Sequence, residues 1–179
     1  MNRTRMIIFP VIVLLQLAVL VFMIAKQEYI LAAGEKILIQ CEPVDPRSLF
    51  SGDYVILNYT ITSIDFEKIK MKPGEERLPD RNETVYVALE KRKGEKFWTE
   101  AAASRDPEWL KKNYRTIIKG RINQYYDIRF GVEEYFVPQF EGKEIEREMD
   151  NVHVEVSIMP DRESAISRLF LNDREVKFY

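Results

Sequence analysis

The chain has 179 residues, about the length of one domain, and its charges are unevenly distributed. Residues 6–25 carry no charge, whereas residues 26–179 hold 25 Lys and Arg against 29 acids, a net charge of −4. This composition excludes a polytopic membrane protein, a disulfide-stabilised mini-domain and a polybasic nucleic-acid-binding protein. With one Cys and one His, most zinc-type sites are also excluded, so we expect no metal and no cofactor.

The apolar segment 6–25 is predicted to be a transmembrane helix. Twenty helical residues span about 30 Å, the thickness of the hydrocarbon core of a bilayer. Its one polar side chain, Gln16, has an amide that lipid cannot satisfy, so we expect it to bond a neighbouring helix or its own backbone. Arg3 and Arg5 precede the segment, and Lys26 is balanced by Glu28, so the positive-inside rule places the N-terminus in the cytoplasm.

A cleaved signal peptide is the alternative interpretation of the same segment. Signal peptides have a shorter apolar region that ends at a small-residue cleavage site. Here the apolar segment is longer and a charged stretch follows it directly, while the small residues Ala32 and Ala33 come eight residues later. We therefore expect an uncleaved anchor, and the chain divides into a cytoplasmic tail (1–5), a transmembrane anchor (6–25), a juxtamembrane linker (26–35) and an extracytoplasmic β-domain (36–179).

The protein is predicted to lie in the cell membrane, with the domain in the periplasm or outside the cell. Cys41 would then lie in an oxidising compartment. It has no partner thiol in its own chain. A buried small apolar residue and an intermolecular disulfide both remain open for it.

Alternating apolar residues predict about nine short strands in residues 36–179. The strongest pattern places Val55, Leu57 and Tyr59 on one face of a strand. The candidate strands are 36–41, 54–62, 84–92, 96–103, 114–123, 126–130, 152–158, 165–171 and 174–178. Two short helices are predicted, one opened by Asp106 and Pro107 and one over 141–149. The fold class is therefore mainly β: an antiparallel sandwich or partly open barrel, with residues 68–82 as a long loop.

Residues 42–59 contain two tight turns between two of these strands. Pro43 and Pro46 end the first strand because proline has no N–H to donate. Asp45-Pro46-Arg47 favours one turn, and Gly52 before Asp53 allows a positive φ at a second.

The same residues carry a resemblance to a known family. Gly52-Asp53-Tyr54, followed by Leu57 and Tyr59, spells G-D-Y-x-x-L-x-Y, and the chain resembles the GDYXXLXY family of membrane-anchored proteins. The similarity extends through the Pro-Val-Asp-Pro-Arg sequence that begins at Pro43. It implies a single N-terminal anchor and, because members tend to be encoded beside polytopic membrane proteins, a polytopic partner; it implies no reaction.

Parts of the sequence also resemble or suggest two kinds of enzyme. Leu49 to Asp53 also resembles the Leu-x-x-Gly-Asp sequence of signal-peptidase-like serine proteases, but the nucleophile position falls on Val44, which has no hydroxyl. A glycan-acting hydrolase needs two carboxylates about 5–10 Å apart, and Asp53, Glu133 and Glu134 lie near aromatic residues. Such a pair is a weak indication in a chain with 29 acids.

An aromatic cluster occupies residues 125–140. It either packs into the core or forms an exposed docking surface for protein, lipid or sugar. We name as candidate partner contacts, together with Gln16, the residues Tyr125, Tyr126, Phe130, Tyr135 and Phe136.

Two further polar residues stand out. His153 alternates with valines and is predicted to be a surface imidazole, and Arg121 is predicted to form an ion pair with Asp53 or with an acid on a neighbouring strand. The sequence therefore favours a non-enzymatic accessory or interaction subunit of a polytopic membrane protein, with a cell-envelope hydrolase or a glycan-binding module as the alternatives and the ligand unknown.

Overall fold

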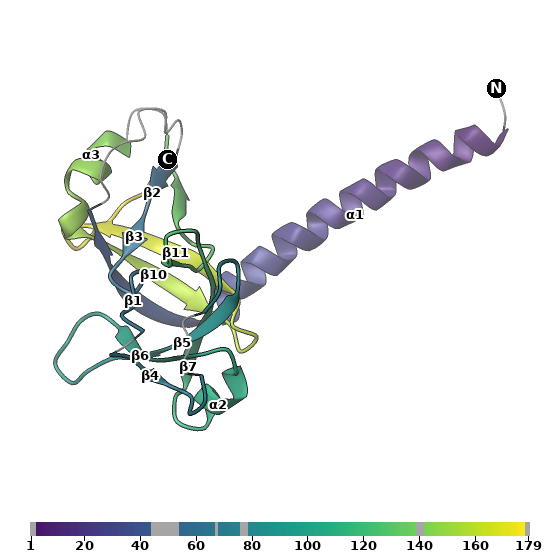
Figure 1. Ribbon diagram of the computed structural model, residues 1–179. Coiled ribbons are helices and arrows are strands. Elements are labelled where there is room, and N and C mark those ends of the chain that lie inside the picture. The colour runs from purple at the N-terminus through teal and green to yellow at the C-terminus, as the bar shows by residue number, and fades with distance from the viewer. Residues whose placement is uncertain (1–2, 44–53, 67, 76–78, 139–141, 178–179) are drawn as a thin grey trace.

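The computed structural model describes residues 3–43, 54–66, 68–75, 79–138 and 142–177, which form one long helix and a β-rich domain (Figure 1). The elements in chain order are α1 (Arg3–Ala33), β1 (Glu35–Glu42), β2 (Tyr54–Ile56), β3 (Asn58–Tyr59), β4 (Lys70–Met71), β5 (Thr84–Glu90), β6 (Thr99–Ser104), α2 (Pro107–Lys111), β7 (Thr116–Ile122), β8 (Ile128–Arg129), β9 (Glu134–Phe136), α3 (Gly142–Arg147), a 3₁₀ turn (Met149–Asn151), β10 (Val152–Ile158), β11 (Ser164–Leu171) and β12 (Arg174–Glu175). The motif positions Asp45, Pro46, Arg47, Gly52 and Asp53 lie outside the described residues.

The strands form three sheets. One five-stranded sheet has the order β12-β11-β10-β1-β3, a second has the order β4-β6-β5-β7-β8, and β2 pairs with β9 alone. The prediction of a mainly β fold with short helices in the domain is confirmed. The described strands do not close into a barrel. One pairing departs from the antiparallel expectation, since the short strand β4 runs parallel to β6.

A single large apolar core joins residues of all three sheets. The predicted alternation is confirmed over residues 55–61, where Val55, Leu57, Tyr59 and Ile61 are fully buried. The single strand predicted over 54–62 is wrong, however. Its first part, β2, pairs with β9, and its second part, β3, pairs with β1 in a different sheet.

A smaller apolar cluster lies on the opposite face of the second sheet. Helix α2 covers that face by burying Leu110 against Ala88, Ala102 and Ile117. The helix begins as predicted, because the Asp106 carboxylate accepts the backbone N–H groups of residues 108 and 109. The other half of this outer face, over β7 and β8, is not covered by α2.

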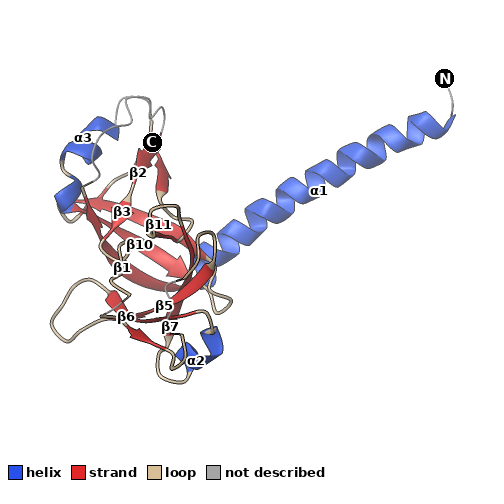
Figure 2. Cartoon of the chain, viewed as in Figure 1, coloured by secondary structure: helices blue, strands red, loops and turns tan. Residues whose placement is uncertain are grey.

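Helix α1 extends away from the domain over most of its length (Figure 2). Residues 8–33 are long and apolar enough to cross a membrane, and none of its most apolar stretch is buried. The helix does not end near Ala25. Residues 26–33, expected to be a linker, continue it, because no Gly or Pro interrupts the chain until Gly34.

The prediction for His153 is wrong. The imidazole is 4% exposed, because β10 lies in the middle of its sheet and is covered on both faces. It stacks on the ring of Phe170, with ring centroids 4.9 Å apart, and contacts Phe97 edge to face.

Candidate functional site

The described motif residues fasten the β2–β3 segment to residues 132–136. The backbone N–H of Leu57 donates to the carbonyl oxygen of Glu133 at 2.7 Å. The buried hydroxyl of Tyr59 donates to the carbonyl oxygen of Val132. Tyr54 lies opposite Phe136 across the β2–β9 pair, and their rings meet edge to face at 6.3 Å. The backbone of Leu57 and the side chains of Tyr54 and Tyr59 therefore hold a neighbouring segment in place.

The local environment explains the chemistry of Tyr59. Burial, with smaller contributions from Cys41 and Glu133, raises the pKa of the Tyr59 hydroxyl well above its ordinary value. A phenol in that state is a hydrogen-bond donor at neutral pH, so its role here is to satisfy a buried carbonyl group.

The acids considered for glycan hydrolysis do not converge in the described part of the chain. The Glu133 carboxylate is 8% exposed and accepts the backbone N–H groups of Phe130 and Gly131. Glu134 is exposed on β9, and Asp53 lies outside the described residues. Glu133 thus closes the turn at Gly131, where φ is +79°.

The aromatic cluster splits into buried and exposed members. Phe130 is 6% exposed and packs in the core, and Tyr135 is half-buried against it. Tyr125, Tyr126 and Phe136 are 74%, 48% and 74% exposed. The first two lie in the turn between β7 and β8, and Phe136 lies on β9. Of the five named aromatic residues, these three are therefore the exposed ones that a partner can contact fully.

The base of α1 is joined closely to the first sheet. Ile30 is 5% exposed, and its carbonyl oxygen accepts the Ser157 hydroxyl at 2.6 Å and the Gly34 N–H at 3.1 Å. Gly34 is required where the helix passes into β1. A Cβ there would overlap the Ser157 hydroxyl and lie 2.8 Å from the carbonyl oxygen of Ile30. The helix therefore enters the domain without a flexible connection.

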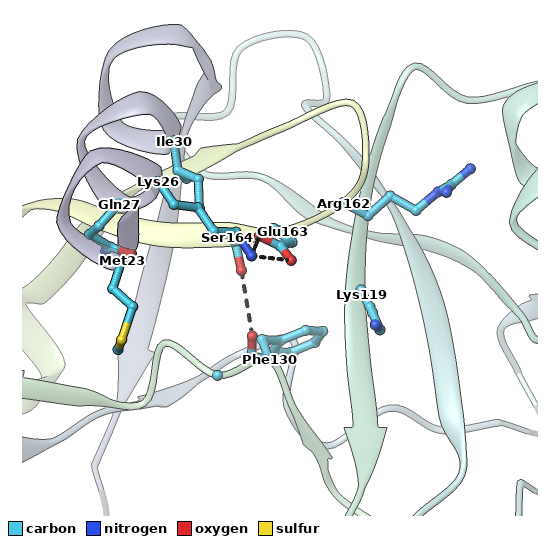
Figure 3. A pocket seen from close by; sticks show the side chains of 10 residues that line it. Met23, Lys26, Gln27, Ile30, Lys119, Phe130, Arg162, Glu163 and Ser164 are labelled. Atoms are coloured by element: carbon cyan, nitrogen blue, oxygen red, sulfur yellow. Dashed lines mark hydrogen bonds and ion pairs between the residues drawn. The ribbon is translucent and has the colours of Figure 1, made fainter. Parts of the chain in front are cut away.

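An ion pair and a pocket lie on one side of this junction (Figure 3). The ammonium of Lys26 lies 2.7 Å from the carboxylate of Glu163 in the turn between β10 and β11. A cavity of about 440 Å³ opens between the helix and the domain, and Met23, Phe130 and Lys119 are among the residues that line it. Lys119 and Arg162 lie across the pocket from the helix (Figure 3).

No metal centre or reactive thiol is found in the described part of the chain. No group of three His, Cys, Asp or Glu side chains is placed to hold an ion among these residues. Burial raises the pKa of the Cys41 thiol to about 12, so the thiolate that reacts or binds metal is not formed at neutral pH. Cys41 is 2% exposed, which favours the buried apolar residue over the intermolecular disulfide.

Comparison with known proteins identifies the family. A family model described as GDYXXLXY protein matches residues 16–169. The chain belongs to the GDYXXLXY family. No curated protein and no solved structure matches it. The matched range begins inside α1 at Gln16 and ends in β11, so the GDYXXLXY model includes the later part of α1 together with the β-rich domain.

Sequence reasoning missed the residues that join the helix to the domain in this GDYXXLXY protein. Ser157 and Glu163 are more than 120 positions from their partners Ile30 and Lys26. The available signals were weak: a glycine directly after an apolar helix, and a serine among valines and isoleucines in a central strand. Arg121 is exposed, and no ion pair to it is found among the described residues, so the predicted pairing is not seen there.

Proposed function

We propose that this GDYXXLXY protein is a single-pass membrane protein whose β-domain lies outside the cytoplasm and serves as an accessory subunit of a polytopic membrane protein. Residues 1–5 then lie in the cytoplasm and α1 spans the bilayer. Arg3 and Arg5 support this orientation through the positive-inside rule.

The observation that carries the proposal is the rigid junction between α1 and the domain. The Ser157–Ile30 hydrogen bond, the close packing at Gly34 and the Lys26–Glu163 ion pair fix the domain relative to the helix. A domain that acts independently on soluble substrates needs only a flexible tether. A fixed mount instead presents one defined surface beside the membrane, which suits a subunit that binds a membrane protein.

The junction also supports an anchor that is retained. Ile30 is buried against the domain and supplies the carbonyl oxygen that Ser157 binds. Cleavage after Ala33 would remove this side chain and leave the Ser157 hydroxyl without its acceptor, a loss of about 1–3 kcal/mol for a buried polar group.

Two features provide contacts for the partner. Gln16 lies mid-way along the otherwise apolar segment 6–25 of α1 and is exposed, so a neighbouring transmembrane helix can accept its hydrogen bond. Phe136 is 74% exposed on the two-stranded sheet, and a large exposed aromatic residue is typical of an interface core. One contact lies in the membrane segment and the other on the β-domain.

The hydrolase alternative has little support in the described residues. Glu133 is bound to two backbone N–H groups, and the position that a serine nucleophile would take is Val44, outside the described residues. Purified full-length protein that hydrolyses peptides or envelope glycans would nevertheless restore it.

The test is site-specific photocrosslinking in living cells. A photoreactive residue at Phe136 is expected to capture a polytopic membrane protein, identified by mass spectrometry. The same group at Lys91, exposed just after β5, is the matched control and should not capture it. Gln16→Leu should reduce the yield modestly, whereas Gln16→Asn keeps an amide and should preserve it. If Phe136 and Lys91 capture the same proteins, the proposal is wrong.

A further inference from the structure

The open half of the outer face of the second sheet carries three basic side chains. Lys119 and Arg121 project from β7 and Arg129 from β8, and all three are exposed, whereas the alternate residues of both strands are buried. Arg121 and Arg129 are direct cross-strand neighbours. We call Lys119, Arg121 and Arg129 the basic face.

The charges of the basic face are not neutralised within the described residues. None of the three forms an ion pair there, and the nearby acids are already engaged: Glu163 with Lys26, and Glu108 with Lys111 and Arg162. Like charges directly opposite each other destabilise a strand pair. An external anion between Arg121 and Arg129 would remove that repulsion.

Two positions of β7 lie near α1 and indicate where the basic face lies. At its start, the Thr116 hydroxyl donates to the Glu35 carboxylate just beyond the end of the helix. Three residues later, Lys119 lines the same pocket as Met23 and Lys26 (Figure 3). The strand therefore proceeds toward the end of the apolar segment, and Arg121 and the β7–β8 turn follow in that direction.

The β7–β8 turn carries two exposed tyrosines, Tyr125 and Tyr126. The side-chain oxygen of Asn123 accepts the N–H groups of Tyr125 at 2.7 Å and Asp127 at 3.0 Å, which holds the turn in a tight loop. Tyr126, at φ +69°, lies with its ring 5.5 Å from the guanidinium of Arg81. Tyrosine is enriched where a membrane protein meets the headgroup layer, because its ring is apolar and its hydroxyl is polar.

We propose that the basic face and the β7–β8 turn bind the phosphate groups of anionic phospholipids in the leaflet next to the domain. Arginine suits this ligand because its planar donors match phosphate oxygens. Residues 26–179 as a whole have a net charge of −4, so an anionic membrane would repel most of their surface and attract this face. The inference rests on the proposed membrane anchor and is independent of the polytopic partner.

A fluorescent reporter in the turn tests the contact directly. Gln124 is exposed in the β7–β8 turn, and Gln124→Cys provides a thiol for an environment-sensitive dye. The native Cys41 will not compete, because it is buried with a pKa raised to about 12. Lys93→Cys, labelled in the same way, is the matched control, because it lies past the far end of β5 from the basic face. The full chain is reconstituted in nanodiscs of phosphatidylcholine, with or without phosphatidylglycerol, and quenching by headgroup-labelled lipid is measured.

We expect phosphatidylglycerol to increase quenching at position 124 and leave position 93 unchanged. Each basic residue near an anionic surface strengthens binding about fivefold, so the triple variant K119Q/R121Q/R129Q should weaken the docked state by roughly a hundredfold. About 1 M salt, where the Debye length is about 3 Å, should have the same effect. The triple variant should melt no lower than the wild type, because it removes the repulsion between Arg121 and Arg129, so its loss of quenching is not a loss of fold.

Three results would overturn the inference. Equal quenching at position 124 in both kinds of disc would exclude anionic phospholipid as the ligand, and membrane contact of this turn only in native membranes would assign the basic face to an acidic protein instead. A chain that fails to enter the discs would overturn the anchor itself. A chain that enters the discs but shows no quenching at position 124 would overturn only the lipid contact.

Discussion

The hydroxyl of Ser157, one residue before the end of β10, donates a hydrogen bond of 2.6 Å to the carbonyl oxygen of Ile30 in the last turn of α1. The last carbonyl groups of a helix have no partner within the helix, so this acceptor would otherwise be unsatisfied on one side. The bond connects the helix to the central strand of a five-stranded sheet, which makes the orientation of the domain relative to the helix a property of the fold.

The junction leaves no room for a larger residue at Gly34. Gly34→Ala is expected to destabilise the domain by about 1–3 kcal/mol, the usual cost of overpacking, because the new Cβ overlaps the Ser157 hydroxyl. Thermal unfolding of the full chain in nanodiscs measures this. Adding Ser157→Ala should recover part of the loss. Strictly additive effects of the two substitutions would contradict the contact.

Among the described motif residues, Tyr59 is the one whose buried side chain forms a hydrogen bond. Tyr59→Phe should cost about 1–3 kcal/mol of folding free energy, because the carbonyl oxygen of Val132 is then buried without its donor. Chemical denaturation provides the measurement. Tyr125→Phe is the control, since its ring is 74% exposed, and it should change stability by less than about 0.5 kcal/mol. Equal effects of the two substitutions would rule out the structural role.

The buried thiol of Cys41 should make the folded protein less stable at alkaline pH. Its pKa is about 12 in the folded chain against 9.0 ordinarily, so the unfolded chain loses its proton first. The stabilisation from the protonated thiol is therefore complete below pH 9.0 and declines as the pH rises toward about 12, by up to about 4 kcal/mol over the whole interval. Tyr59 acts in the same direction. Denaturation midpoints above pH 9 should fall less steeply for Cys41→Ala; identical slopes would show that the thiol is not responsible.

The buried imidazole of His153 should make the folded protein less stable at mildly acidic pH. Burial and the nearby Lys96 lower its pKa, against a smaller raising effect of Asp173, whose carboxylate lies 3.7 Å from the imidazole. The unfolded chain therefore takes up a proton first as the pH falls below 6.5, and stability should decrease there. His153→Phe, which keeps a flat ring between Phe97 and Phe170, should remove this decrease. As the chain has one His, its ring-proton resonance reports the folded pKa directly, and a value at or above 6.5 would contradict the assignment.

Local patterns were sufficient to predict most of the strands. Alternation placed Val55, Leu57 and Tyr59 on one buried face, and Asp106 with Pro107 predicted the start of α2 correctly. Both signals act over a few residues and depend little on the rest of the chain.

Long-range packing was not predictable in the same way. Strand β9 has three residues, too few to show a period, and its partner β2 is about 80 positions away. His153 follows the same alternation as a surface residue, and only the central position of β10 in its sheet explains its burial. The same limit applies to the basic face, because Arg121 and Arg129 become neighbours only through the β7–β8 register.

Purification of the tagged full chain from native membranes in mild detergent, followed by mass spectrometry, tests the proposed accessory role most directly. We expect one polytopic membrane protein to co-purify with the wild type, with less of it recovered for Gln16→Leu and least for Phe136→Asp. The matched control Lys91→Asp, at another exposed position, should retain the wild-type amount. A chain that is recovered alone from native membranes, with no crosslinked partner in living cells, would contradict the proposed function.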